Sequence, residues 1–289
     1  MRALAEYVMK GRTEAVLAVV LTTGTVLFAW VGAAVLALVI LRKGSSQGVY
    51  LLFWALIPAV VVAAFGDTGP VTTLVGVTFV ATVLRVTSSW SWALVIAVVS
   101  GVLTGIVLLT LGQGYIEQIL QLLGDTLAQL ASQSVNSEQS AQWVALQPSV
   151  QQVAGLLGLS NAFTVIMCLI LARWWQALLY NPGGFRAEFH SLRLTPPLTV
   201  LLLTMGLLLS SLGAEYRLWA LIFAVPFMFS GFALIHGLVA QKQLNANWLG
   251  VFYFFWLLLD PVKALVLILA VVDSWLNIRG RLAKCQTPP

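Results

Sequence analysis

The sequence predicts an all-α fold, a polytopic transmembrane helical bundle, from its composition, its hydrophobic runs and the placing of its basic residues. The 289 residues are 60% hydrophobic and only 9% charged, with a mean hydropathy of +0.95, whereas soluble domains are about 25% charged. No hydrophilic block is long enough to form a separate soluble domain. We therefore expect residues 1–289 to form a single integral membrane domain in a lipid bilayer.

Eight hydrophobic runs, bounded by charges or turn residues, are the expected helical segments. Several, Val71–Leu84 above all, are shorter than the roughly 20 residues that cross a bilayer core of about 30 Å, so we expect some short or buried helices. The first run is longer than the apolar region of a signal peptide and should remain attached. The runs are Ala15–Leu41, Val49–Phe65, Val71–Leu84, Trp90–Leu111, Val153–Ala172, Leu198–Leu212, Leu218–Val239 and Trp248–Leu276.

The basic residues predict which ends of the runs face the cytoplasm. Between Arg85 and Arg173 the chain has no lysine or arginine. Because short cytoplasmic loops collect Lys and Arg and translocated loops do not, residues 113–151 should face outward. Alternation along the chain then places Arg42 inside and Asp67 outside. The pattern predicts a multi-pass protein of the bacterial inner membrane with both termini in the cytoplasm.

The same rule conflicts with a single crossing at two of the runs. Ala15–Leu41 and Trp248–Leu276 each have basic residues at both ends. A break at Thr22–Thr25 would fold the first run into a short helical hairpin. Asp260-Pro261 divides the last run, and proline disfavours helix in the residue before it, so two short antiparallel helices are expected there. The alternative is one kinked helix with an external tail, but the positive charge of the tail favours the pair.

Residues 113–151 contain an amphipathic helix followed by a linker. Such a helix can lie on the bilayer or cover an external cavity. Ser132–Gln142, rich in Ser and Gln, is typical of a flexible linker. The apolar side chains of the helix recur at spacings of four and three, at Ile116, Leu120, Leu123, Leu127 and Leu130.

The pattern of residues 176–197 predicts a cytoplasmic interfacial helix. The turn at residues 181–184, Asn-Pro-Gly-Gly, ends the preceding structure. After it, apolar and basic side chains fall on separate helical faces, so the helix could anchor to acidic lipid headgroups or dock a cytoplasmic partner. The apolar face holds Phe185, Phe189 and Leu192, and the candidate docking residues are Arg186, His190 and Arg193, together with Arg279 near the carboxyl end.

Four ionisable residues inside apolar runs are costly to bury and are candidate functional residues. His236 could be a ligand contact or a polar residue at the cytoplasmic interface. Asp260 and Lys263 are three residues apart, which permits an ion pair on a helix, although a proton or substrate site stays open. Asp273 lies close enough to Arg279 to tie the last helix to a basic loop.

The motifs of most other function classes are missing from the sequence. No HExxH, GxSxG or phosphate-loop pattern occurs, and two histidines are too few for a typical metal site. We therefore expect neither an enzyme nor a bound cofactor. No basic run interleaved with aromatics suggests nucleic acid. Cys168 in an apolar run and Cys285 in the basic tail should lie too far apart for a disulfide.

Two further patterns concern packing. Gly101–Gly105 and Ala33–Ala37 place small residues four apart, which lets helices approach closely within the bundle or between subunits. Tryptophans beside the basic residues match the aromatic belt of a membrane interface. These expected anchors are Trp90, Trp92, Trp174 and Trp175.

Three stretches of the chain resemble the bacterial YybS-like family of membrane proteins. They are Met1–Glu6, Asn181–Leu194 and Val272–Arg279, although Asn277 stands where that family usually has a second acid. The resemblance implies a remote relation to the substrate-capture subunits of energy-coupling-factor transporters. Those proteins are bundles of about six helices with cytoplasmic termini, an external ligand cavity and a surface that docks a coupling subunit. By the same resemblance, Ala33–Ala37 would take part in that docking.

The sequence supports two hypotheses of function. The leading one is a transport-type protein that binds a small hydrophobic or amphiphilic molecule; it predicts a cavity open to the outside, lined with Trp, Ser and Thr and covered by the helix at residues 116–130. The alternative is a non-transport scaffold that docks a cytoplasmic or membrane partner, which predicts a filled bundle with a partner-sized cytoplasmic patch.

Overall fold

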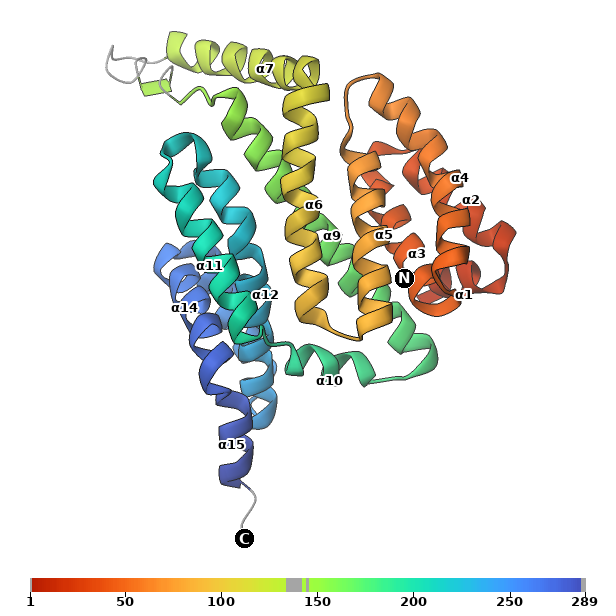
Figure 1. Cartoon of the computed structure of the whole chain (residues 1–289), viewed down its shortest axis with the longest axis vertical. Coiled ribbons are helices and arrows are strands. Elements are labelled where there is room, and N and C mark those ends of the chain that lie inside the picture. The colour runs from red at the N-terminus through yellow and green to blue at the C-terminus, as the bar shows by residue number, and fades with distance from the viewer. Residues whose placement is uncertain (1, 134–141, 144–145, 287–289) are drawn as a thin grey trace.

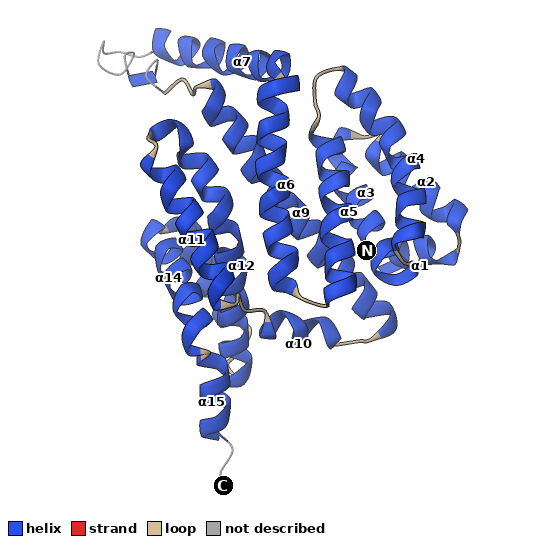
Figure 2. Ribbon diagram, viewed as in Figure 1, coloured by secondary structure: helices blue, strands red, loops and turns tan. Residues whose placement is uncertain are grey.

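The computed structural model describes residues 2–133, 142–143 and 146–286, and every regular element in these ranges is helical (Figure 2). The linker predicted at Ser132–Gln142 lies largely outside them. The helices are α1 (Arg2–Lys10), α2 (Arg12–Thr23), α3 (Ala29–Lys43), α4 (Ser45–Ala64), α5 (Gly69–Thr87), α6 (Trp90–Leu111), α7 (Gln113–Ser132), α9 (Val150–Tyr180), α10 (Gly184–Ser191), α11 (Pro196–Ser211), α12 (Arg217–Gln241), α13 (Asn247–Leu258), α14 (Asp260–Leu276) and α15 (Ile278–Gln286), with 3-10 turns η1 (Val26–Phe28) and η2 (Ala214–Tyr216).

The predicted all-α polytopic bundle is confirmed. Helices α4, α5, α6, α9 and the η2–α12 unit are each long and apolar enough to cross a membrane. Two bent pairs, α10–α11 with a 65° bend and α13–α14 with a 114° bend, would raise the number of candidate spans from 5 to 7 if each pair were one broken span rather than a re-entrant loop. The run Val71–Leu84 is not a short segment as expected, because Gly69-Pro70 begins the helix earlier and Arg85–Thr87 extends it to 19 residues.

The bundle has two groups of helices (Figure 1). One group holds α1 to α6 and α9, and the other holds α11 to α14, while α7 lies across one end and α10 across the opposite end. We call the end covered by α7 the α7 end. The end covered by α10 is the basic end, because Arg85, Arg173 and Arg279 all lie close to α10. The bundle thus has two ends of different character.

The first long run is broken where predicted. α2 ends at Thr23, and α3 packs back along it so closely that a Cβ atom at Gly32 would lie 2.6 Å from Thr23 Oγ1. The turn lies inside the bundle, since a Cβ at Gly24 would lie 3.7 Å from Cβ of Pro58 in α4. Every residue from Val31 to Leu41 is buried, so neighbouring helices enclose the irregular backbone, as such a break requires.

The last run is divided at Asp260-Pro261, also as predicted. Leu259 is extended, with φ −114° and ψ 112°, and Pro261 lies in the first turn of α14, where a missing N–H costs nothing. The chain returns to the basic end, because Gln241 Nε2 at the end of α12 donates a hydrogen bond to the carbonyl oxygen of Arg279, at 3.1 Å. The run therefore folds back on itself instead of forming a single kinked helix, but the 114° bend leaves α13 and α14 far from the antiparallel arrangement that was predicted.

Small residues hold the centre of the bundle together. A Cβ atom at Gly101 in α6 would lie 2.6 Å from the carbonyl oxygen of Gly158 in α9. Gly105 and Gly155 accept the ring of Trp219, whose Nε1 donates to the carbonyl oxygen of Gln151 at 2.9 Å. The internal packing interpretation of Gly101–Gly105 is thus confirmed.

Two expectations about surface residues were wrong. Ala33 and Ala37 are completely buried in α3, so they cannot form the docking surface that the family resemblance implied. Trp90 and Trp175 are core residues, with 8% and 0% of their surface exposed, whereas Trp92 and Trp174 are exposed as interface anchors would be. Successive residues of an α-helix point about 100° apart, so tryptophans one or two residues apart on α9 and α6 have different environments.

Candidate functional site

A cavity of about 840 Å³ lies between α9, α10, α12 and α13, toward the basic end. We call it the aromatic cavity, and its volume is within the range of small-molecule sites. Aromatic and long apolar side chains from all four helices form its wall. They are Phe163, Met167, Ile170 and Trp174 of α9, Phe185 and Phe189 of α10, Phe229 and Phe232 of α12, and Tyr253 and Trp256 of α13.

Helical spacing places these side chains on common faces. On α9 the wall residues recur at spacings of four, three and four, which is one face of a helix. Phe232 packs edge-on against Trp256, with ring centroids 5.0 Å apart, and against Tyr253 at 5.4 Å. These aromatic contacts join α13 to α12 although α13 has no buried residue of its own.

Polar side chains gather at the edge of the aromatic cavity nearest α10. His236 Nε2 lies 2.9 Å from the hydroxyl oxygen of Tyr253, and the rings of His190 and His236 are 6.4 Å apart. Arg186 also lines this edge and is otherwise exposed. Burial and the nearby Arg186 and Arg279 lower the pKa of His190 below 6.5, so its imidazole is neutral at pH 7. The cavity is therefore apolar over most of its length and cationic at one edge.

α10 is fixed to α9 rather than resting on the surface. The carboxylate of Glu188 in α10 pairs with the guanidinium of Arg173, with one N–O distance of 2.8 Å. Gly183, at φ +85°, supplies the left-handed residue that starts α10 after the turn. Phe185 and Phe189, which the sequence placed on a lipid-facing or docking surface, instead line the aromatic cavity.

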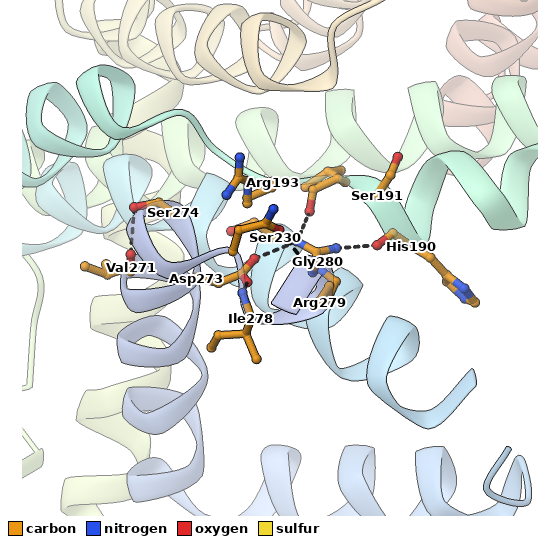
Figure 3. A network of polar contacts seen from close by, with 12 residues as sticks. His190, Ser191, Arg193, Ser230, Val271, Asp273, Ser274, Ile278, Arg279 and Gly280 are labelled. Carbon is orange, nitrogen blue, oxygen red and sulfur yellow. Dashed lines mark hydrogen bonds and ion pairs between the residues drawn. The ribbon is translucent and has the colours of Figure 1, made fainter. Parts of the chain in front are cut away.

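A buried clasp joins the carboxyl end of α14 to the segment after α10 (Figure 3). Asp273 Oδ2 accepts from Arg279 Nη2 at 2.8 Å, and the same nitrogen donates to the carbonyl oxygen of Leu192 at 2.7 Å. Arg279 Nη1 donates to the carbonyl oxygen of His190. Asp273 Oδ1 accepts from the backbone N–H of Ile278 at 2.8 Å. The expected tie between the last helix and a basic loop is thus present.

The clasp changes the set of candidate docking residues. The Arg279 side chain is only 11% exposed, and it bonds within the chain because the carbonyls of His190 and Leu192 have no helical partner at this bend. The structure therefore separates it from Arg186 and Arg193, which keep some exposure. His190 belongs to two regions, since its ring lines the aromatic cavity and its carbonyl joins the clasp.

The four candidate intramembrane residues do not form one site. His236 lines the aromatic cavity and Asp273 belongs to the clasp. Asp260 and Lys263 form an ion pair at 2.8 Å at the other end of α14, with the Asp260 side chain 90% exposed. Their separation from Asp273 is about 20 Å along the helix. The sequence signalled the polar members of the site and three of its aromatic side chains, Trp174, Phe185 and Phe189, but gave no sign that these form one wall with side chains of α12 and α13.

The aromatic cavity does not lie beneath the amphipathic helix, where the transport hypothesis expected a ligand cavity. α7 does form, and Ile116 at its start is buried, but the pocket beside its first turn measures only about 110 Å³. The tryptophans of the aromatic cavity lie near the opposite end.

The aromatic cavity offers hydrogen bonds and positive charge at one edge and apolar surface elsewhere. Within residues 2–133, 142–143 and 146–286, no group of three or more His, Cys, Asp or Glu side chains could hold a metal ion. The arrangement of the aromatic cavity suits the binding of a molecule with both polar and apolar parts. No family model, curated protein or solved structure matches the chain.

Proposed function

We propose that this multi-pass membrane protein is of transport type and binds an anionic amphiphile in the aromatic cavity. The apolar part of the ligand lies among the aromatic rings, and its acidic headgroup lies at the edge formed by Arg186, His190 and His236. The observation that carries the proposal is this cationic edge on an otherwise apolar cavity of about 840 Å³. The proposed role is binding and movement of the ligand, not catalysis.

The energetics favour an amphiphile over a purely polar solute. Each CH₂ group that a ligand buries contributes about 0.8 kcal/mol, so a short alkyl chain among these rings gains several kcal/mol. A headgroup alone would have to lose its hydration for few partners. The guanidinium of Arg186 adds a charge-assisted hydrogen bond to a carboxylate or phosphate. Both parts of the ligand then contribute to affinity.

The placing of charge suggests from which side the ligand enters. By the positive-inside rule the basic end faces the cytoplasm, so the headgroup would lie at the level of the cytoplasmic leaflet. The resemblance to the YybS-like family, and through it to capture subunits, supports a transport-type role with a coupling partner. The ligand cavity of capture subunits opens to the outside, however. We favour entry from the cytoplasmic leaflet, because the aromatic cavity of this protein lies at the basic end.

The scaffold hypothesis has one specific observation in its favour. α13 has 12 residues, none of them buried, and exposes Phe254, Leu257 and Leu258. It is too short to cross a bilayer, so a partner helix could complete this layer. A scaffold would bind such a helix here without needing ligand in the aromatic cavity.

Binding can be measured with a fatty acid that carries a fluorescence-quenching nitroxide, because Trp174 and Trp256 line the aromatic cavity. We expect saturable quenching in the purified protein. Arg186→Gln should weaken binding about tenfold, since a charged hydrogen bond is worth roughly 1.5 kcal/mol. Arg193→Gln, which removes the same charge seven residues along the chain and outside the cavity wall, should leave the affinity unchanged.

The matched pair separates the two hypotheses. Equal weakening by both substitutions would mean that only the overall surface charge attracts the probe. Absence of saturable quenching, with a protein retained on the exposed face of α13 during purification in mild detergent, would favour the scaffold. Mass spectrometry of the purified protein identifies either kind of bound molecule.

A further inference from the structure

A second pocket, of about 110 Å³, lies at the α7 end between α5, α6 and α9. We call it the oxygen-lined pocket, because eight of its side chains carry oxygen and none carries a positive charge. Its hydroxyl, amide and carboxylate oxygens come from separate helices and from the turn before α5. Among the residues that supply them are Asp67, Thr72, Thr73, Thr104, Asn161 and Thr164.

A buried asparagine organises the pocket. Asn161 is 5% exposed, and its Nδ2 donates to Thr104 Oγ1 at 2.8 Å and to Ser100 Oγ at 3.1 Å. Its Oδ1 accepts from Thr73 Oγ1 at 2.9 Å. Both amide hydrogens are therefore used inside the bundle, and the carbonyl oxygen keeps one lone pair free. The network fixes the amide with its oxygen on the side of Thr73.

Other oxygens of the pocket keep acceptor capacity. Thr104 Oγ1 donates to the carbonyl oxygen of Ser100 at 2.8 Å and so presents a lone pair. In the part of the chain that the structure describes, the hydroxyls of Thr164 and Ser160 make no hydrogen bond. Packing between helices does not require these additional oxygens. A ligand that accepts electron pairs from oxygen would use them.

The electrostatic surroundings favour a cation. Asp67 Oδ1 accepts only the backbone N–H of Gly69, at 2.9 Å, and no Lys or Arg of the described ranges forms an ion pair with it. Burial first, and Asp67 second, raise the pKa of Tyr115 above 10.0, so the phenol stays neutral. Between Lys43 and Arg173 the single basic residue, Arg85, lies at the basic end.

Two more carboxylates, Glu117 and Asp125 on α7, add negative charge at this end, and Arg217 at the start of α12 is the exception. A low-dielectric wall with charge of one sign concentrates counter-ions at its mouth. The α7 end should therefore attract cations, and the oxygen-lined pocket is where they would find ligands.

We propose that the oxygen-lined pocket binds a sodium ion. Small hard cations take carboxylate, carbonyl and hydroxyl oxygens as ligands. The oxygen-lined pocket offers the carboxylate of Asp67, the amide carbonyl of Asn161 and the hydroxyls of its threonines. One carboxylate, that of Asp67, balances one positive charge, whereas calcium sites in proteins usually recruit several. The pocket volume of about 110 Å³ is large enough for the ion together with water molecules.

Thermal unfolding of the purified full-length protein tests the sodium proposal without any amphiphile. A negative result would therefore count against the sodium site and leave the proposed binding of an amphiphile unaffected. Sodium chloride should raise the melting temperature saturably, by about 3 °C at roughly tenfold excess over Kd. Choline chloride at the same ionic strength should not. Calorimetric titration with sodium chloride gives a second reading of the same site.

Two substitutions of equal charge change complete the test. Asp67→Asn retains an oxygen for the N–H of Gly69 but loses the charge, and should abolish the sodium-dependent shift. Asp125→Asn changes an exposed carboxylate on α7 and should keep it. Thr73→Val, which removes an oxygen ligand without a charge, should weaken sodium binding at least threefold. An equal shift with choline, or a full shift in Asp67→Asn, would overturn the proposal.

Discussion

The aromatic cavity and the oxygen-lined pocket lie toward opposite ends of one bundle and differ in what they can hold. The first measures about 840 Å³ and presents Arg186 at its edge, whereas the second measures about 110 Å³ and presents Asp67. α9 contributes to both, through Met167 and Trp174 in the first and Asn161 in the second. A single helix thus links the cavity for which we propose an anionic amphiphile to the pocket for which we propose a cation.

The two sites also differ in how their walls are supported. The aromatic cavity is closed by two short elements, α10 with 8 residues and α13 with 12, and the clasp fastens the segment after α10 to the end of α14. The oxygen-lined pocket lies among long helices that meet at Gly101 and Gly158. Walls made of short elements open at lower free energy than long packed helices. We therefore expect the aromatic cavity to deform and the oxygen-lined pocket to stay rigid.

The largest effect should come from breaking the clasp. Asp273→Ala leaves the guanidinium of Arg279 buried without its carboxylate, which costs about 3–5 kcal/mol of unfolding free energy. Chemical denaturation in detergent measures this change. The affinity for the amphiphile should fall with it, because α10 and α14 lose their link, while the sodium-dependent thermal shift should persist.

Asp260→Ala is the matched control for the clasp. It removes the carboxylate of an exposed ion pair on the same helix, and exposed pairs contribute little. If both substitutions lower the unfolding free energy equally, the buried Asp273–Arg279 pair contributes no more to stability than the exposed pair does. If Asp273→Ala removes the sodium response as well, the two sites do not have independent support.

A smaller effect, centred on the oxygen-lined pocket, should follow from Gly158→Ala. The added Cβ would lie 2.6 Å from the carbonyl oxygen of Gly101, so α6 and α9 must separate, at a cost of about 1–3 kcal/mol. Asn161 and Thr104 lie one helical turn from this contact, so sodium affinity should weaken more than amphiphile affinity. The two titrations measure the difference.

Gly114→Ala serves as the control for this substitution. A Cβ atom there meets nothing within 4 Å, and alanine favours helix over glycine, so stability should stay the same or rise slightly. A Gly158→Ala protein with unchanged stability and unchanged sodium affinity would show that close approach of α6 and α9 does not shape the pocket.

The sequence predicted the features that depend on local chemistry. The breaks at Gly24 and Leu259 follow from a polar Thr-Gly stretch and from a proline, and the turn before α10 follows from Asn-Pro-Gly-Gly. The basic residues on each side of the last run led to the folded-back pair, because short loops rich in Lys and Arg stay on the cytoplasmic side and a single crossing cannot leave both ends there. These signals act over a few residues and need no knowledge of packing.

Features that depend on which helices meet were not predictable in this way. The apolar face of α10 looked suited to lipid, yet it lines the aromatic cavity because Glu188 binds Arg173 of α9. Asn161 is a single polar residue in an apolar run, and nothing in the sequence indicates that it joins Thr73 and Thr104 from two other helices. In lipid and in protein interiors the same apolar side chains are favourable, so hydrophobic pattern alone does not separate a cavity wall from a lipid-facing surface.

The smallest effect should be a pH dependence confined to the aromatic cavity. Burial and the nearby arginines lower the pKa of His190 below its ordinary value of 6.5, so its ring is neutral at pH 7 and gains a proton as the pH falls. The added charge beside Arg186 should strengthen binding of an anionic amphiphile about threefold at pH 5, a typical value for one partly solvated charge pair. Titrations at pH 7 and pH 5 with an alkyl sulfonate, whose headgroup stays ionised at both pH values, measure the change.

The same histidine sets the sign of a stability change. Because the folded state holds the pKa of His190 below its ordinary value of 6.5, the fold disfavours the protonated ring, and its contribution to stability is present above pH 6.5 and lost as the pH falls. His190→Gln keeps a polar side chain without titration, and should reduce both the gain in affinity and the loss of stability, with His236 at the same edge accounting for any remainder. A gain at pH 5 that survives His190→Gln in full would assign the effect to other groups.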